Sequence, residues 1–244
     1  MILKKTILYS FISIFVIISL GILYIFTKKI VFKYYTISQN QIERYKKNRD
    51  SLILNSKQLN LNNFINIDTN AIVFIGNSLT AGFEFDKYFP NSKLVNKGEY
   101  GNVTYGIILK IDQTIKIQPN KIFIEIGIND ILSSFPMDTI KNNYKQIIGL
   151  ITKRLPETKI YCHSILPVNF NDKKTNIIYN KNIVEINIFI KSLSNNKTLF
   201  YIDLNTEFSL NGNLNPIYDS GDHLHLNSIG YKKWSSIISP YIYE

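Results

Sequence analysis

From about residue 68 onward, short runs of β-branched and aromatic residues alternate with longer stretches of helical periodicity. Several of the short runs are apolar on both faces, which is typical of parallel strands covered by helices. Such alternation constrains the fold strongly, because it indicates an α/β domain with a parallel sheet. The expected strands are 72–75, 93–95, 122–126, 159–163 and 199–202, and the expected helices are 103–117, 138–155, 174–193 and 228–238.

Four clusters of polar residues and glycines follow the expected strands, each just past a strand end. Ser78 follows the first strand, Gly101 the second and Asn129 the third, and the segment 219–234 follows the fifth and leads into the last helix. Because catalytic groups gather at the carboxyl ends of parallel strands, we expect these clusters to converge on one edge of the sheet.

Ser78 is a candidate nucleophile, although a serine after a strand is more often a turn or helix-capping residue. A serine hydroxyl is weakly nucleophilic unless a base takes its proton. The base must come from the three histidines of the chain, His163, His223 and His225. A carboxylate is needed to orient that histidine, and Asp222 lies three residues before His225.

Two further requirements can be read from the same segments. A nucleophile needs hydrogen-bond donors for the developing oxyanion, and Gly101, Asn129 and the N–H of Ser78 are the candidates. Asp219, four residues before His223, is a rival orienting acid, but its offset matches no known arrangement, so Asp222 is favoured.

Together the four segments resemble the blocks of the SGNH/GDSL hydrolase superfamily, in order and spacing, over roughly residues 70–240. The matching segments are "GNSL" (76–79), the glycine Gly101, "GIND" (127–130) and "DHLH" (222–225), and "SILPVN" and "HLNSIGYKKW" also look like bacterial acetylhydrolase-like members. The resemblance implies that Ser78 is the nucleophile, that His225 is the general base oriented by Asp222, and that Ser78, Gly101 and Asn129 form the oxyanion hole. The sequence departs from the usual family pattern at two positions, with Asn77 in place of Asp and His223 where Gly is frequent.

The fold implied by this resemblance is a three-layer α/β/α sandwich with a flavodoxin-like five-stranded parallel sheet. The implied activity is hydrolysis of O-acyl esters, O-acetyl or short-chain, through an acyl-enzyme, without a metal or organic cofactor. Three alternatives remain: an acyltransferase acting on an envelope polysaccharide, a lysophospholipase or thioesterase, and a non-catalytic module that binds acylated glycans or lipids. The expected substrate is an acylated small molecule, glycan or lipid.

Several other residues have structural interpretations. Asp130 is expected to support the loop that carries Asn129, and His163 is expected to be buried with its nitrogens satisfied. Cys162, the only cysteine, is expected in the core, and a single cysteine excludes an intrachain disulfide and a paired-cysteine zinc site. Trp234 is expected to pack the last helix onto the sheet.

The net charge of +10 is unevenly distributed. Residues 1–60 contain ten of the 28 Lys and Arg residues but only two of the 18 acidic ones, so residues 61–244 are nearly neutral. The basic excess surrounds a hydrophobic segment, where attraction to anionic lipid explains it better than nucleic acid does. We therefore expect no nucleic-acid partner.

That segment, 6–26, has 21 uncharged residues, enough for a helix of roughly 31 Å that matches the hydrocarbon core of a bilayer. A cleaved signal peptide is the alternative, but the run is longer than a usual h-region and no small-x-small site follows it. We expect an N-terminal transmembrane helix within 1–33, a basic stalk at 34–67 and the hydrolase domain at 68–244. The flanking lysines lean by one charge toward a cytoplasmic domain, yet a large domain can be translocated regardless, and an extracytoplasmic location is expected.

Overall fold

The computed structural model describes residues 71–244, which contain one five-stranded sheet in the order β2-β1-β3-β4-β5. Every neighbouring pair of strands in this sheet is parallel. This is the flavodoxin-like order, so the expected sheet is confirmed. The strands are β1 (Ile72–Gly76), β2 (Leu94–Gly98), β3 (Lys121–Glu125), β4 (Lys159–His163) and β5 (Leu199–Ile202).

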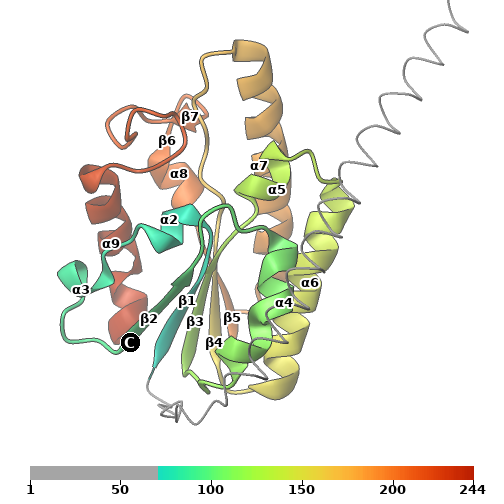
Figure 1. Ribbon diagram of the computed structural model, residues 1–244, viewed down its shortest axis with the longest axis vertical. Coiled ribbons are helices and arrows are strands. Elements are labelled where there is room, and N and C mark those ends of the chain that lie inside the picture. The colour runs from blue at the N-terminus through green and yellow to red at the C-terminus, as the bar shows by residue number, and fades with distance from the viewer. Residues whose placement is uncertain (1–70) are drawn as a thin grey trace, which may run out of the picture. The chain divides into compact units, whose positions relative to one another are not determined.

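Helices cover both faces of the sheet, as Figure 1 shows. On one face lie α4 (Thr104–Ile115), α6 (Met137–Arg154) and α7 (Lys173–Leu193), and on the other lies α9 (Ser228–Tyr243). The central strands β1 and β3 are buried along their whole length because both faces are covered, whereas the edge strand β2 is only partly buried. The expected helices are thus all present, and α9 continues to Tyr243, beyond the expected end at residue 238.

The remaining elements are too short to show helical or strand periodicity in a sequence. They are α2 (Ser78–Ala81), α3 (Phe85–Tyr88), α5 (Ile128–Leu132), α8 (Leu204–Phe208) and the two-residue strands β6 (Ser209–Leu210) and β7 (Asn213–Leu214). Of these, α2 and α5 begin immediately after the carboxyl ends of β1 and β3. Because these two strands adjoin in the sheet, the two short helices start side by side at the point where the strand order reverses.

The core on the α9 face is organised around a row of stacked aromatic rings, one from each of four strands. Phe74 of β1 stacks on Phe123 of β3 at 4.5 Å, Phe123 on Tyr161 of β4 at 4.6 Å, and Tyr161 on Phe200 of β5 at 5.1 Å between ring centroids. Each such pair contributes about 0.5–1.5 kcal/mol beyond area burial. Trp234 of α9 lies in the same core and is fully buried, so the expectation that it packs the last helix onto the sheet is confirmed.

Within residues 71–244, no helix combines the length and the apolar character that crossing a bilayer requires. The expected transmembrane segment 6–26 and the expected stalk 34–67 lie outside the described residues.

Candidate active site

Ser78 stands on a tight strand-to-helix turn at the carboxyl end of β1. Gly76 ends the strand, Asn77 caps α2, and Ser78 is the first helical residue. The Asn77 side chain accepts a hydrogen bond from the backbone N–H of Leu79 at 2.7 Å. Only glycine fits at position 76, because a Cβ there would lie 2.1 Å from Thr80 Oγ1 and 2.4 Å from the backbone oxygen of Glu125. The turn therefore packs tightly on β3 and presents the serine hydroxyl, which remains partly exposed.

His225 and Asp222 reach Ser78 from the opposite end of the domain sequence. His225 Nε2 lies 2.8 Å from Ser78 Oγ, and His225 Nδ1 lies 2.5 Å from Asp222 Oδ2. The other carboxylate oxygen of Asp222 accepts the backbone N–H groups of Leu224 and His225 and the hydroxyl of Ser220. The structure thus joins a hydroxyl, an imidazole and a carboxylate in one hydrogen-bonded chain.

The charge of Asp222 is favoured by its surroundings. Desolvation raises the pKa of this carboxyl, but hydrogen bonds from the His225 backbone and ring and from the Leu224 backbone outweigh it and hold the pKa well below its usual range. An ionised Asp222 accepts a hydrogen bond from the His225 tautomer with its proton on Nδ1, and in that tautomer Nε2 is the acceptor facing Ser78 Oγ.

Asp219 and His223 form a second pair in the same loop. Asp219 Oδ1 accepts the backbone N–H groups of Gly221 and His223, and Asp219 Oδ2 lies 3.2 Å from His223 Nδ1, outside good hydrogen-bond geometry. His223 has a φ of 70°, in the left-handed region, and its carbonyl accepts the N–H of Asn169. Asp219 therefore contacts His223 and the loop backbone, whereas the carboxylate bound to the His225 ring is that of Asp222.

The loop after β2 and the start of α5 carry the two other expected site residues, Gly101 and Asn129. Asn129 is the second residue of α5, and its side-chain amide donates to the carbonyl of Asn102 at 2.8 Å. Gly101 precedes Asn102 and has a φ of 70°. Gly127, which precedes α5, has a φ of 122°, so only glycine turns the chain here without strain. The structure thereby brings the expected oxyanion donors Gly101 and Asn129 to neighbouring loops.

Asp130 is buried and stabilises this region. Its carboxylate accepts the backbone N–H of Thr104 at 3.0 Å and the Thr104 hydroxyl at 2.5 Å, so it caps the start of α4 from 26 residues away. Burial raises the pKa of Asp130 to about 6, against the lowering effect of these hydrogen bonds. Asp130 has the supporting role expected for it, since it fixes the loop containing Gly101 to the helix containing Asn129.

The interior residues were predicted less completely. Cys162 is buried as expected, and burial raises the pKa of its thiol to about 12. His163 is also buried, but the expectation that its nitrogens are satisfied is wrong, because neither has a hydrogen-bond partner within the described part of the chain. Its ring lies instead between Phe123 and Trp234, and burial lowers the pKa of the imidazole to about 3.

Glu125 was not singled out by the sequence reasoning. It is 1% exposed at the carboxyl end of β3, directly under the Ser78 turn, and its two carboxylate oxygens have no hydrogen-bond partner within residues 71–244. A signal was available, because "IFIEIG" places a single acidic residue inside an otherwise apolar buried run.

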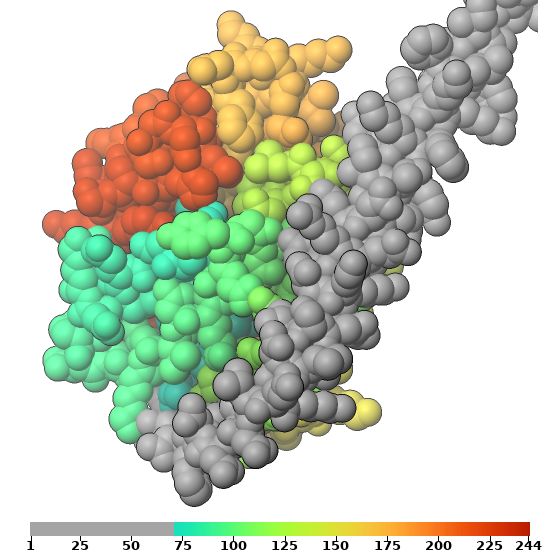
Figure 2. Space-filling model, viewed as in Figure 1, coloured from blue at the N-terminus to red at the C-terminus, as the bar shows by residue number. Residues whose placement is uncertain are grey.

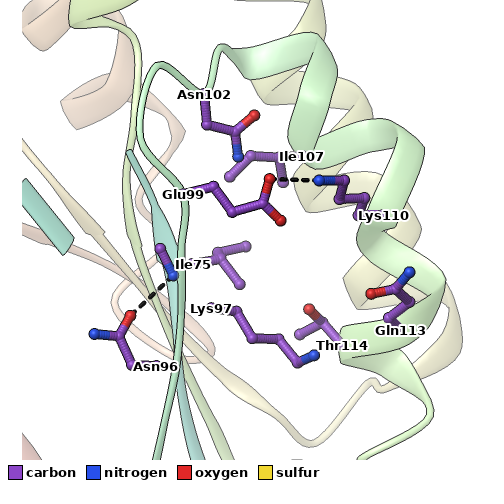
Figure 3. Close-up of a pocket in the computed structure, with 10 residues that line it drawn as sticks. Ile75, Asn96, Lys97, Glu99, Asn102, Ile107, Lys110, Gln113 and Thr114 are labelled. Carbon is purple, nitrogen blue, oxygen red and sulfur yellow. Dashed lines mark hydrogen bonds and ion pairs between the residues drawn. The ribbon is translucent and has the colours of Figure 1, made fainter. Parts of the chain in front are cut away.

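Two hollows border the loops that carry these residues. One, of about 440 Å³, is lined by His223 together with Asn169, Phe170, Lys173 and Ile177. The other, of about 270 Å³, lies between β2 and α4, where Figure 3 shows Asn102 and the ion pair between Glu99 and Lys110.

Figure 2 shows that the C-terminal segment, in red, adjoins the first segments of the domain, in blue-green, as the contact of His225 with Ser78 requires. Among residues 71–244, no cluster of His, Cys, Asp and Glu could hold a metal ion.

Comparisons with known proteins identify the family of this chain. Residues 74–233 match the model of the GDSL-like Lipase/Acylhydrolase family. A solved structure from Streptococcus pneumoniae, of a candidate platelet activating factor, is 27% identical with a TM-score of 0.67, over 84% of this chain and 97% of that one. No curated protein matches the sequence.

Two more distant structures show the same fold. A GDSL-like lipase from Bacteroides thetaiotaomicron is 22% identical with a TM-score of 0.64, over 72% of this chain and 88% of that one. A variant of an acetyl-xylooligosaccharide esterase from Geobacillus is 18% identical with a TM-score of 0.51, over 71% of this chain and 94% of that one. The family match covers well over half of the chain, so this protein belongs to the GDSL-like lipase/acylhydrolase family and is an ester-hydrolysing enzyme.

Proposed function

We propose that the protein is a serine esterase that hydrolyses O-acetyl or other short-chain O-acyl esters through an acyl-enzyme. The observation that carries this proposal is the hydrogen-bonded chain in which Ser78 Oγ lies 2.8 Å from His225 Nε2 and His225 Nδ1 lies 2.5 Å from Asp222. A partly exposed hydroxyl in this setting is an activated nucleophile.

In the proposed reaction, His225 Nε2 takes the proton of Ser78 Oγ as the oxygen attacks the ester carbonyl. The oxyanion is stabilised by the backbone N–H groups of Ser78 and Gly101 and by the side-chain amide of Asn129. His225 then gives its proton to the leaving alcohol, and the acyl group stays on Ser78. A water molecule, deprotonated by His225, attacks the acyl carbonyl, and the acyl group leaves as a carboxylic acid while His225 returns the proton to Ser78 Oγ. Asp222 stabilises the imidazolium formed in each half.

The hollow beside His223 is the proposed site for the alcohol part of the substrate. His223, which lines this hollow, is two residues before His225 in the sequence. The wall also combines the amide side chain of Asn169 and the ammonium of Lys173 with the apolar side chains of Phe170 and Ile177. A mixture of polar and apolar wall groups suits a hydroxyl-bearing alcohol such as an acylated sugar better than an acyl chain.

The test is Ser78→Ala measured on p-nitrophenyl acetate and by labelling with a fluorophosphonate. We expect kcat to fall by at least about 10³-fold and labelling to disappear, because the nucleophile is lost, while the melting temperature changes little. Ser236→Ala is a matched control, since that exposed hydroxyl bonds only the backbone of Lys233 on α9. Retention of activity and labelling by Ser78→Ala contradicts the proposal.

We also propose that residues 6–26 anchor the enzyme in a membrane, with the catalytic domain on the extracytoplasmic side. The support is the length and uncharged character of the segment and the basic residues around it. Protease treatment of intact cells tests the side, because an external domain is degraded without lysis. Recovery of the full-length chain in the soluble fraction contradicts the anchor.

A further inference from the structure

Under the nucleophile turn lies a group of buried polar side chains that the proposed reaction does not use. Glu125, Asn77 and Thr80 are each at most 1% exposed. Within residues 71–244, both carboxylate oxygens of Glu125, Nδ2 of Asn77 and Oγ1 of Thr80 have no hydrogen-bond partner. Leaving such groups buried and unpaired costs free energy, so their retention at this place calls for a physical reason.

The register of the sheet places these groups together. Gly76 of β1 is paired with Glu125 of β3. This pair lies two residues toward the carboxyl edge from the stacked pair Phe74 and Phe123, on the same face of the sheet. The missing side chain of Gly76 leaves the space that Thr80 Oγ1 occupies beside the Glu125 backbone. Asn77, the next residue, caps α2, and its side chain lowers the pKa of the Glu125 carboxyl.

The two ends of the Asn77 side-chain amide have different surroundings, the α2 turn and the buried interior. Its Oδ1 accepts the N–H of Leu79 at 2.7 Å and so sets the start of α2, where Ser78 lies. Its amide nitrogen has no hydrogen-bond partner within residues 71–244, while the Asn77 side chain lowers the pKa of the neighbouring Glu125 carboxyl. Any rotation of the Asn77 amide moves both ends at once, because Oδ1 and Nδ2 belong to one plane.

The protonation state of Glu125 follows from its burial. Desolvation raises the pKa of this carboxyl to about 8, against the lowering effect of the Asn77 amide. At neutral pH the group is therefore mainly an uncharged carboxylic acid. Its carbonyl oxygen can accept from Asn77 Nδ2 without a buried charge.

We propose that Glu125, as a neutral carboxylic acid, is a positioning residue for the nucleophile: it accepts from Asn77 Nδ2 and so holds Asn77 Oδ1 on Leu79 N–H and Ser78 toward His225. This inference rests on the proposed role of Ser78. It also explains why position 77 is Asn here, because an Asp at this position sets a second carboxyl group against Glu125 in a water-excluded site.

The test compares Asn77→Asp, Glu125→Gln and the double variant by the rate of fluorophosphonate labelling of Ser78 and by kcat on p-nitrophenyl acetate. We expect Asn77→Asp to be at least about tenfold slower, and the double variant to recover to within about threefold of the unmodified enzyme, because residues in contact are non-additive. A double variant as slow as Asn77→Asp, or an Asn77→Asp variant with full activity, overturns the proposal.

Glu125→Gln and Glu125→Met separate hydrogen bonding from volume. The first retains a carbonyl acceptor for Asn77, so kcat is expected to stay within about threefold, whereas the second retains only the volume and is expected to lose at least about tenfold in kcat with KM unchanged. Thr158→Val is the matched control, because it removes a buried hydrogen bond, from the Thr158 hydroxyl to Pro119, at the opposite edge of the sheet. Equal loss of kcat in Thr158→Val and Glu125→Met contradicts a positioning role.

The melting temperatures keep this inference distinct from the proposed function. If the unmodified enzyme is neither labelled nor active, the proposed function fails, but coupling between positions 77 and 125 is still measurable. We then expect the melting temperature lost in Asn77→Asp to be regained in the double variant. Strictly additive changes in melting temperature overturn the pairing.

Discussion

Each end of strand β3 carries a buried ionisable side chain, and the two side chains differ in their hydrogen bonding. Lys121 at the amino end and Glu125 at the carboxyl end point to the same face and are 5% and 1% exposed. Lys121 Nζ donates to the backbone oxygens of Tyr241, Ile242 and Glu244 at 2.8–3.1 Å, so every donor of the ammonium is used. Glu125 has no such partner within residues 71–244.

The difference reflects what each edge of the sheet has to do. At the amino edge the Lys121 ammonium binds the end of α9, and its three hydrogen bonds offset the desolvation that lowers the pKa of this group. At the carboxyl edge stand Ser78 and Asn129, and there Glu125 has the proposed role of holding Asn77 in the turn that carries Ser78. Proteins break the rules of polar satisfaction chiefly at functional sites.

The largest expected effect at the carboxyl edge is that of Asp222→Asn. We expect kcat to fall by about 10⁴-fold with little change in melting temperature, because the amide no longer fixes the proton of His225 on Nδ1. Asp219→Asn is the comparison, since Asp219 is paired with His223, and its kcat is expected to fall by less than about tenfold. Equal losses in the two variants contradict the assignment of Asp222 to the base. Both are measured on p-nitrophenyl acetate.

The second prediction concerns the pH dependence of stability. The pKa of Glu125 is raised from 4.5 to about 8, so its contribution to stability is fully present below pH 4.5 and is lost progressively as the pH rises to about 8. Glu125→Gln has no proton to lose, so its free energy of unfolding should gain on the unmodified enzyme by at most about 1.4 kcal/mol per pH unit across that window.

Other titratable groups near Glu125 have little effect on the difference in unfolding free energy between the two proteins. His163 on the neighbouring strand and the phenols of Tyr144 and Tyr231 are present in both proteins, so their own titrations largely cancel. Urea unfolding at intervals between pH 4.5 and 8.5 gives the difference. A constant difference across this range shows that the carboxyl is already ionised at pH 4.5 and contradicts the raised pKa.

The third prediction tests the amino edge with Lys121→Met. We expect a loss of about 2 kcal/mol, because three carbonyls at the end of α9 lose their common donor, and hence a melting temperature lower by about 5 °C. The value of kcat should not change. Lys159→Met at the same edge is the control, since that half-exposed lysine makes only a 3.3 Å contact with Glu244 and should cost at most about 0.5 kcal/mol. A fall in kcat for Lys121→Met would break the contrast between the two edges.

Much of the fold could be predicted because periodicity is strong where elements are long. The five strands and four long helices follow from apolar runs and helical stripes, and the resemblance of four segments indicated Ser78, Asp222 and His225. The short helices α2 and α5 were not predicted, since four or five residues make little more than one turn. The part of α9 past Pro240 accepts hydrogen bonds from Lys121, which lies about 120 residues away in the sequence, so local periodicity does not indicate it.

Side-chain pairing at the site was harder to predict, because it depends on register and loop geometry. Nothing in the sequence shows that Asp130 caps the start of α4 at Thr104 rather than its own turn. Asp219 contacts His223, whose backbone is in the left-handed region, and sequence spacing does not reveal that conformation. His163 was expected to be satisfied because buried histidines usually are, but its ring contacts Phe123 and Trp234, and neither ring nitrogen has a hydrogen-bond partner within residues 71–244.

The smallest predicted effect is that of Asn227→Ser, which tests whether α9 links the two edges. Asn227 Oδ1 caps α9 by accepting the N–H groups of Ile229 and Gly230, while its Nδ2 donates to the carbonyls of Ile217 and Asp219. Serine retains the cap but loses both bonds to the loop, so we expect a loss of about 1 kcal/mol and a two- to threefold lower kcat.

Asn227→Ala removes the cap as well and is expected to cost about 1 kcal/mol more, with no further change in kcat. The difference between the two variants therefore isolates the cap, which affects stability, from the loop bonds, which affect the positions of Asp219 and the histidines that follow it. Unfolding by urea and steady-state kinetics measure the two quantities. If kcat falls further in Asn227→Ala than in Asn227→Ser, the start of α9 itself positions the site, and the carboxyl edge combines stability and function in the same bonds.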